Sequence, residues 1–523
     1  MRPTSRLTPR AVVRLVTTAV LLALVPSLQA VTLKVYVHKP IKTADGKVRK
    51  IDDRHFGLNT VIWDTDFNDP KTLKALKDLK MRSLRFPGGS RSDTYDWKSN
   101  KSYIMKSEPG YIPGKKTLNS WEWWVDFDDF AKVALKLKAE AFITVNYGTG
   151  TPKMAADWVK YSKKKKYGFK YWEIGNECYG EWEEDVRSKP WDPETYATEA
   201  AKYMKQMRAA DPSIKIGVVA VPGEDSYAKS TRKAVKNPRT KKKHQGWTPI
   251  MLAKLKSLKA IPDFIIHHRY EQDPKYASWR PQNYENDAKL LQSAKGWADD
   301  AKDLRQQLKD YLGSKNAKKV ELVCTENNSV SSMTGKQTVS LVNGLYLADS
   351  FGQLTKTEFN SLTWWALRNG RDKNANNDDY LYGWRNYGDY GIMDGKSTKF
   401  PTFHVMQMLA SFARKGDTVV KTKSSTSMLG CYAVKRKNGN LTVLVINKHP
   451  TKTYKPTVKI GGYKPASTAT ALRYGKKQDD AARLKKSSSK QKPAKSTLKG
   501  IKKESKVSFE PYSVTVLTFT PKK

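Results

Sequence analysis

The stretch KYWEIGNE, residues 170–177, joins a short apolar run to an abruptly polar end. Residues 171–174 have the length and composition of a buried β-strand. Gly175 ends that strand and is followed at once by Asn176 and Glu177. In barrels of parallel strands, a carboxylate at the carboxyl end of a strand lies on the face that carries the chemistry. The stretch therefore predicts a barrel strand that presents Glu177 to a functional site.

A second stretch, VELVCTEN at residues 320–327, has the same form and contains Glu326 near its end. One glutamate at a strand end would more simply be an ordinary polar residue. Two such glutamates, each beside an asparagine, meet the requirement of glycosidic bond hydrolysis for a pair of carboxyl groups. We therefore expect Glu177 and Glu326 to face each other across a sugar.

The segments around these two strands alternate in type. Strands are expected at residues 56–61, 83–86, 141–145, 171–174, 215–220, 263–268, 320–325 and 360–365. Helices are expected at residues 71–80, 121–138, 154–165, 193–210, 248–258, 288–312, 338–352 and 402–414. Alternating strands and helices indicate a parallel α/β architecture. The predicted fold class is α/β, with a (β/α)8 TIM barrel over residues 45–415.

The chain changes character after residue 416, where short strands alternate with turns. Asn438-Gly439 between two of these strands is a strong hairpin signal. Residues 416–523 are therefore predicted to form an appended C-terminal β-sandwich, and residues 31–44 an N-terminal strand that packs with it. Two basic, polar inserts, residues 224–246 and 476–506, are predicted to be mobile loops.

The first 30 residues have the pattern of a signal peptide. Four arginines precede the mostly apolar run 15–25, and SLQA at 27–30 is a plausible cleavage end. The apolar run is too short for a membrane span, and no later span is expected. The mature protein is therefore predicted to be secreted or periplasmic.

The formal charge of +45 raises the question of an anionic partner. Acidic polysaccharide would fit such a charge, and nucleic acid is an alternative through the lysine-rich inserts. The lysines are spread over the chain and no nucleic-acid motif accompanies them, which favours a generally basic, solvated surface. The predicted partner is a polysaccharide or oligosaccharide, with an acidic one as an alternative, and not a nucleic acid; the oligomeric state stays open.

Three cysteines are too few for a disulfide framework. They are read as small packing residues, with a Cys178–Cys324 bridge as an alternative. Strand alternation would point Cys324 to the same side as Glu326. Residues 372–378, DKNANND, partly resemble a calcium loop but lack its central glycine and its bidentate glutamate. A polar surface loop is favoured there, and no metal or cofactor is expected.

Four motifs together are similar to those of clan A glycoside hydrolases, and most of all to family 51 α-L-arabinofuranosidases. They are GNECYG at 175–180, TENN at 325–328, RFPGG at 85–89 and HRY at 268–270. The resemblance covers the barrel and extends to the trailing β-sandwich. It implies double displacement with Glu177 as the acid/base and Glu326 as the nucleophile.

The same resemblance implies roles for the neighbouring polar residues. Asn176 would bond the sugar 2-hydroxyl, and Arg85 would orient the nucleophile beneath the sugar. Tyr270 would donate to Glu326, and His268 would lie near the acid/base. Arg85 would also be compatible with a buried structural ion pair, and a lone histidine such as His268 is more often a packed core residue.

Alternation along the last strand lets only one of Trp364 and Trp365 face the cleft, and Trp365 is the predicted one. Asn59 is a further substrate-binding candidate, together with Trp63 and Asn146, on weaker grounds. All three lie at or just beyond the carboxyl ends of predicted strands.

The chain departs from the arabinofuranosidase pattern at three places. Ser90 stands where an asparagine is usual, Glu173 where a glycine is usual, and Asn327 where a tryptophan is usual. The predicted function is a secreted retaining glycosidase of plant or algal polysaccharide, most simply α-L-arabinofuranosidase-like. The alternatives are a xylosidase, glucuronidase or endo-glycanase of the same clan, or a polysaccharide-binding protein without catalysis.

Overall fold

The structure is a computed structural model that describes residues 30–43, 45–112, 115–272, 285–372 and 376–522. The predicted signal peptide therefore lies outside the described residues apart from Ala30. Among the helices of the described chain, none is both long and apolar enough to cross a membrane.

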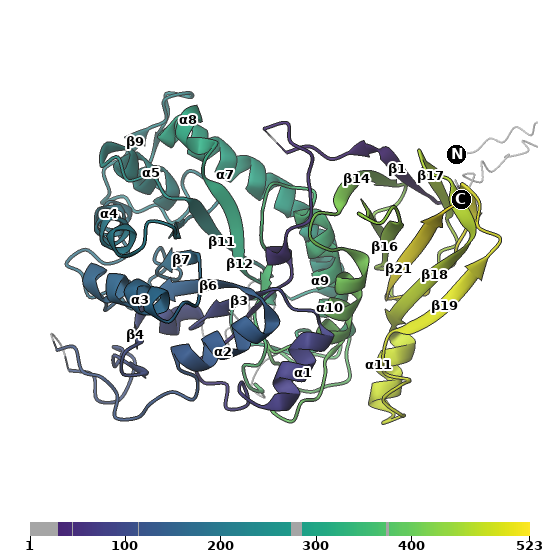
Figure 1. The fold of residues 1–523 in the computed structure, drawn as a ribbon, viewed down its shortest axis with the longest axis horizontal. Helices are drawn as coiled ribbons and strands as arrows, with labels where there is room; N and C mark the ends of the chain where they lie inside the picture. The colour runs from purple at the N-terminus through teal and green to yellow at the C-terminus, as the bar shows by residue number, and fades with distance from the viewer. Residues whose placement is uncertain (1–29, 44, 113–114, 273–284, 373–375, 523) are drawn as a thin grey trace, which may run out of the picture. The chain divides into compact units, whose positions relative to one another are not determined.

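Eight strands close into a parallel barrel, which confirms the predicted (β/α)8 fold (Figure 1). The order around the barrel is β11-β12-β13-β2-β3-β6-β7-β8. The bounds are β2 Gly57–Asn59, β3 Ser83–Phe86, β6 Glu140–Val145, β7 Tyr171–Ile174, β8 Lys215–Val219, β11 Phe264–Gln272, β12 Glu321–Val330 and β13 Thr363–Trp364. β11 and β12 run further than expected, so Tyr270 and Glu326 also lie within strands.

Helices surround the barrel, and several begin at a proline capped by the preceding side chain, as at Asp69 and Thr151. Their bounds are α1 Pro70–Asp78, α2 Phe127–Leu137, α3 Pro152–Lys164, α4 Pro193–Ala210, α5 Trp247–Ser257, α6 Asp287–Ser293, α7 Trp297–Leu312, α8 Ser314–Ala317, α9 Leu341–Leu354 and α10 Pro401–Phe412.

The predicted helix 121–138 is wrong in its first part, because α2 begins only at Phe127. Asp126 caps α2 by accepting from the backbone N–H of Asp129. Trp123 instead bonds through its backbone N–H to the carbonyl of Asn100. Asn100 lies between the short strands β4 (Tyr95–Asp96) and β5 (Lys101–Ser102).

Nine of the strands outside the barrel form one curled sheet in the order β19-β18-β21-β16-β15-β14-β1-β17-β20. Their bounds are β1 Thr32–Pro40, β14 Thr418–Ser424, β15 Leu429–Lys435, β16 Leu441–Asn447, β17 Thr457–Gly461, β18 Pro465–Gly475, β19 Ala494–Lys499, β20 Glu504–Lys506 and β21 Ser513–Pro521. The N-terminal strand β1 pairs with β14 and β17. This sheet is the predicted C-terminal β-sandwich.

Alternation along β16 explains how the sheet joins the barrel. Leu441, Val443 and Val445 belong to a core enclosed by the sheet itself. Leu444 and Ile446, on the other face, belong to the large core that includes α9 and α10. β16 is thus buried on both faces, and Figure 1 shows α9 and α10 on the side of the barrel toward the sheet.

The two basic inserts are structured, so their prediction as mobile loops is wrong. Residues 235–244 contain the paired strands β9 (Val235–Lys236) and β10 (Lys243–His244), with the fully buried Asn237 bonded to Asp310 on α7. The second insert contains α11 (Lys476–Arg483), β19 and β20, and its buried Asp479 pairs with Arg385. A few specific polar contacts anchor segments whose average composition resembles that of a loop.

Candidate active site

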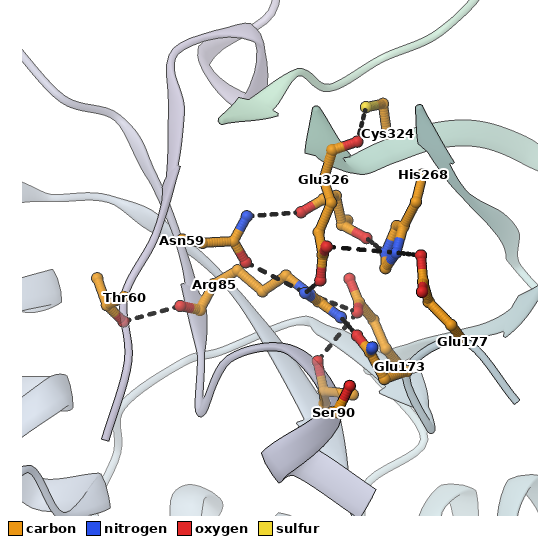
Figure 2. A network of polar contacts seen from close by, with 12 residues as sticks. Asn59, Thr60, Arg85, Ser90, Glu173, Glu177, His268, Cys324 and Glu326 are labelled. Atoms are coloured by element: carbon orange, nitrogen blue, oxygen red, sulfur yellow. Dashed lines mark hydrogen bonds and ion pairs between the residues drawn. The ribbon is translucent and has the colours of Figure 1, made fainter. Parts of the chain in front are cut away.

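The structure brings Glu177 and Glu326 together at the carboxyl end of the barrel (Figure 2). His268 on β11 lies between them, with its Nδ1 2.9 Å from Glu177 Oε1 and 3.6 Å from Glu326 Oε2. One carboxylate oxygen of each glutamate and the imidazole nitrogen all lie within 4.8 Å of one another. Two side chains from opposite parts of the barrel, β7 and β12, therefore reach one position in space.

Arg85 on β3 is fully buried at the centre of the site, and all three nitrogens of its guanidinium donate hydrogen bonds. Nη1 donates to Glu326 at 2.7 Å and to Asn59 at 3.1 Å. Nε donates to Glu173 at 2.8 Å, and Nη2 donates to Asn176 at 2.8 Å. Burial opposes the charge on Arg85, but Glu173 and Glu326 outweigh that effect and raise its pKa above the usual range.

A bulge in β12 gives Glu326 its direction. His267 pairs with Cys324 and His268 with Glu326, so Thr325 is an extra residue in this strand. The Thr325 hydroxyl lies 3.1 Å from His268 Nε2, so the consecutive residues Thr325 and Glu326 both reach the site.

The bulge also breaks the alternation that was expected to place Cys324 beside Glu326, and that prediction is wrong. Cys324 Sγ lies against the backbone oxygen of Glu326 and not against its carboxylate (Figure 2). All three cysteines are buried and free, so the alternative of a Cys178–Cys324 bridge is wrong as well.

The remaining predicted residues fall into two groups. Tyr270 donates its hydroxyl to Glu326 Oε2 at 2.5 Å, and Asn59 donates to the carbonyl of Thr325 at 2.8 Å. Asn146 instead bonds to Tyr95 and Thr149 and holds its own loop together.

Trp365 packs in a small apolar cluster beside the site, with Val61, Trp63, Tyr270 and Tyr390. It is 8% exposed, whereas Trp364 is 1% exposed and packs in the main core. A Cβ at Gly89 would lie 2.7 Å from the ring of Trp365, so the second glycine of RFPGG permits this close approach. Trp365 is therefore the strand-end tryptophan placed next to the site.

Glu177 accepts further hydrogen bonds from two aromatic side chains that the sequence did not single out. The Tyr179 hydroxyl and Trp182 Nε1 each donate to its carboxylate at 2.9 Å. Burial would raise the pKa of Glu177, but the contacts with His268, Tyr179 and Trp182 outweigh it and lower that pKa. The expected general acid thus has a stabilised carboxylate in the free protein.

Sequence reasoning also missed a buried acidic layer under Asn176. Glu183 Oε1 accepts from the Ser90 hydroxyl at 2.9 Å and from Asn176 Nδ2 at 2.8 Å. Asp93 accepts from the backbone N–H of Asn176 at 3.0 Å. Burial raises the pKa of Glu183, and it raises the pKa of Asp93 to about 6. The only signal was the acidic run 181–185, which does not reveal which side chain turns inward.

Among the described residues, one set could coordinate a metal ion: Glu177, His268 and Glu326. Arg85 already places a positive charge against Glu326, and a cation beside it would be repelled. The chemistry of this set therefore fits an arginine-supported carboxylate pair better than a metal centre. The calcium-like stretch 372–378 includes residues 373–375, which lie outside the described residues.

Two strand-end carboxylates across a (β/α)8 barrel, one of them held by a buried arginine, resemble the paired carboxylates of clan A glycoside hydrolases. No family model matches the chain. It is 29% identical to α-L-arabinofuranosidase C from Emericella nidulans over 182 residues, which are 32% of this chain and 35% of that protein. The matched segment thus spans about a third of the curated relative.

Comparison of structures extends the likeness to the whole fold. A family 51 α-L-arabinofuranosidase from Thermotoga petrophila superposes with a TM-score of 0.66 at 17% identity, covering 94% of this chain and 100% of the other. A family 44 xyloglucanase from Paenibacillus polymyxa gives 0.66 at 14% identity, covering 94% and 99%. The resemblance to clan A glycoside hydrolases near family 51 is confirmed, and the structural matches carry it as a likeness of fold.

Proposed function

We propose that the protein is a retaining glycoside hydrolase that acts on polysaccharide by double displacement. One observation carries the proposal: carboxylate oxygens of Glu177 and Glu326 lie within 4.8 Å of each other at the carboxyl end of the barrel. Retaining enzymes hold their two carboxyl groups about 5–5.5 Å apart, whereas inverting enzymes separate them by about 6.5–9.5 Å to admit a water. The close spacing supports retention.

The first step forms a covalent intermediate. A Glu326 oxygen attacks the anomeric carbon while the bond from that carbon to the leaving oxygen breaks, and Glu177 passes its proton to this oxygen. Arg85 and Tyr270 both donate to Glu326, which holds the attacking carboxylate in one orientation. The leaving part of the substrate departs as an alcohol, and the glycosyl group stays esterified to Glu326.

The second step returns the enzyme to its starting state. Glu177, now a carboxylate, takes a proton from a water molecule whose oxygen attacks the same carbon and releases Glu326. The hydrogen bonds from Tyr179 and Trp182 stabilise this carboxylate form of Glu177. Two inversions at one carbon leave the product with the configuration of the substrate.

The names of curated relatives, such as α-L-arabinofuranosidase C, favour an α-L-arabinofuranoside as the substrate of this protein. Ser90 stands where the arabinofuranosidase pattern has an asparagine and donates to Glu183 beneath Asn176, and this departure keeps xylosidase, glucuronidase and endo-glycanase activities as alternatives. A polysaccharide-binding protein without catalysis is disfavoured, because the site keeps both carboxylates together with Arg85 and Tyr270. The predicted signal peptide supports a secreted or periplasmic location for the mature enzyme.

A panel of aryl glycosides tests the proposal. We expect turnover of the aryl α-L-arabinofuranoside, or else of a xyloside, galactoside or glucuronide, in mono- or disaccharide form. Nuclear magnetic resonance of the first product should show the anomeric configuration of the substrate. Binding to polysaccharide without turnover of any aryl glycoside would contradict catalysis, and an inverted first product would contradict double displacement.

A further inference from the structure

Aromatic side chains continue from the site to the surface on the side of Trp365. Trp63 packs against the cluster that contains Trp365 and Tyr270. Its ring meets that of Trp123 edge to face, with 6.5 Å between centroids, and Trp123 meets Trp121 in the same way at 6.4 Å. These residues follow β2 and precede α2, so they belong to loops at the carboxyl end of the barrel, where Glu326 also lies.

A second aromatic group lies on the side of Glu177. The ring of Tyr179 is 4.5 Å from that of Tyr227 and 5.9 Å from that of Trp182, between centroids. Trp182 and Tyr179 both donate to Glu177, so this group adjoins the acid/base directly. The rings of Trp182 and Tyr227 are 56% and 43% exposed.

The segment that carries the outer part of the first run is strongly exposed. Trp121 is 57% exposed, and Trp124, which follows Trp123 in the same segment, is 68% exposed. Their segment is nevertheless anchored, because Trp123 Nε1 donates to Ser102 and Asn100 donates to the carbonyl of Trp123. Large aromatic surface held in contact with water, and continuous with a functional site, marks a binding surface.

The chemistry of the reaction assigns the two aromatic groups to different parts of a bound substrate. The acid/base protonates the leaving oxygen, so rings beside Glu177 adjoin the leaving part of a substrate. The run that starts at Trp365 and Tyr270 adjoins the nucleophile, and therefore the part of the substrate that becomes bound to the enzyme. An enzyme that removes single terminal sugars needs no rings leading away on this second side.

We propose that the site binds an extended glycan chain on both sides of the bond to be cleaved, and that it cuts within chains. The Trp63–Trp123–Trp121 run holds the sugars beyond the reacting one, and Tyr227 with Trp182 holds the leaving portion. The flat apolar faces of sugar rings match exposed aromatic faces, and the match does not depend on charge. This inference rests on the proposed glycosidase activity and adds the mode of attack.

Linear arabinan, arabinoxylan, xyloglucan and carboxymethyl cellulose serve as probes for the wild-type protein. Cleavage within chains is expected to lower the viscosity of at least one polymer early and to release oligosaccharides. On that polymer, W121A/W124A should reduce kcat/KM at least tenfold, and Tyr227→Ala should also reduce it. Turnover of the best aryl glycoside by W121A/W124A should stay within twofold of wild type.

Leu135→Ala is the matched control, since Leu135 on α2 is 47% exposed but takes no part in either aromatic group. It should leave both rates unchanged. Release of single sugars only from all four polymers, or an unchanged polymer rate in W121A/W124A, would overturn this inference while aryl glycoside turnover continued. If the wild-type protein turned over no aryl glycoside, that result would instead contradict the proposed function itself.

Discussion

Arg85 donates to Glu326 across 2.7 Å although the two residues are 241 positions apart in the chain. The contact joins β3 to β12 through the interior of the barrel, where neither side chain meets water to any extent. A buried charge is tolerated only when it is paired. The same contact therefore pairs two charges inside the barrel and orients the proposed nucleophile.

The roles of the two glutamates can be separated with azide. Glu326→Ala should abolish turnover, because the variant lacks the carboxylate that forms the covalent intermediate. Glu177→Ala should slow hydrolysis of a polysaccharide by about 10²–10⁴-fold. On an activated aryl glycoside, azide should restore the rate of Glu177→Ala and yield a glycosyl azide of retained configuration.

Glu181→Ala is the control, since Glu181 is 66% exposed in its side chain and pairs with Lys229 at the surface. It should keep the wild-type rate with and without azide. Wild-type rates in both Glu177→Ala and Glu326→Ala would refute the assignment of the pair.

Glu173→Gln should weaken the fold and the activity together. Glu173 and Arg85 are both fully buried, and the substitution leaves the guanidinium with one carboxylate in place of two. Removal of one partner from such a pair costs on the order of 3 kcal/mol in the free energy of unfolding. Urea unfolding measures that loss, and kcat should fall because Arg85 no longer has its second anchor.

Glu504→Gln makes the same chemical change in a pair exposed to water on β20. Its urea midpoint should match that of the wild type, because exposed pairs contribute little. Equal midpoints for Glu173→Gln and Glu504→Gln would show that Glu173 is not needed to compensate Arg85.

Trp182→Phe should move the alkaline limb of the pH–rate profile upward. The Trp182 N–H bond stabilises the carboxylate of Glu177 and so lowers its pKa. Without that bond the pKa of Glu177 rises, and the acid keeps its proton to a higher pH. The pH profile of kcat/KM on an unactivated substrate reports the shift, because cleavage of that substrate needs the acid. An activated aryl glycoside should show a smaller shift. An alkaline limb displaced to lower pH would contradict this account.

Asp389→Asn should change how stability depends on pH. Burial raises the pKa of Asp389 to about 7, with Asp394 adding to the effect and the Gly391 N–H bond opposing it. The folded protein then binds a proton that the unfolded chain releases near pH 3.8. This contribution to stability is complete below pH 3.8 and is lost as pH rises to about 7.

Asparagine cannot ionise, so the variant lacks this loss. The free energy of unfolding of Asp389→Asn minus that of wild type should increase between pH 5 and pH 7, which means a relative gain in stability for the variant, by up to about 1.4 kcal/mol per pH unit. Urea unfolding at matched ionic strength measures the difference and cancels the effect of the protein's net charge. A difference that is constant with pH would show that Asp389 is ionised in the fold at acidic pH.

Local patterns predicted the order of strands and helices well, because each barrel strand is an apolar run that ends in turn residues. They were wrong for the first part of the helix before β6. Residues 121–126, WEWWVD, were included in that helix although Trp, Val and Asp are weak helix formers. Trp123 bonds to Asn100 instead, and Asp126 caps α2 at a later start.

The linear pattern was enough to predict that Glu177 and Glu326 lie at the carboxyl end of a barrel, because strand ends and carboxylates can both be recognised in it. The bulge at Thr325, the sharing of Arg85 between Glu173 and Glu326, and the inward turn of Glu183 under Asn176 became visible in the folded structure. Each of these depends on contacts between residues brought together by barrel closure. Their energies come from burial and pairing across strands, which no local stretch of the chain encodes alone.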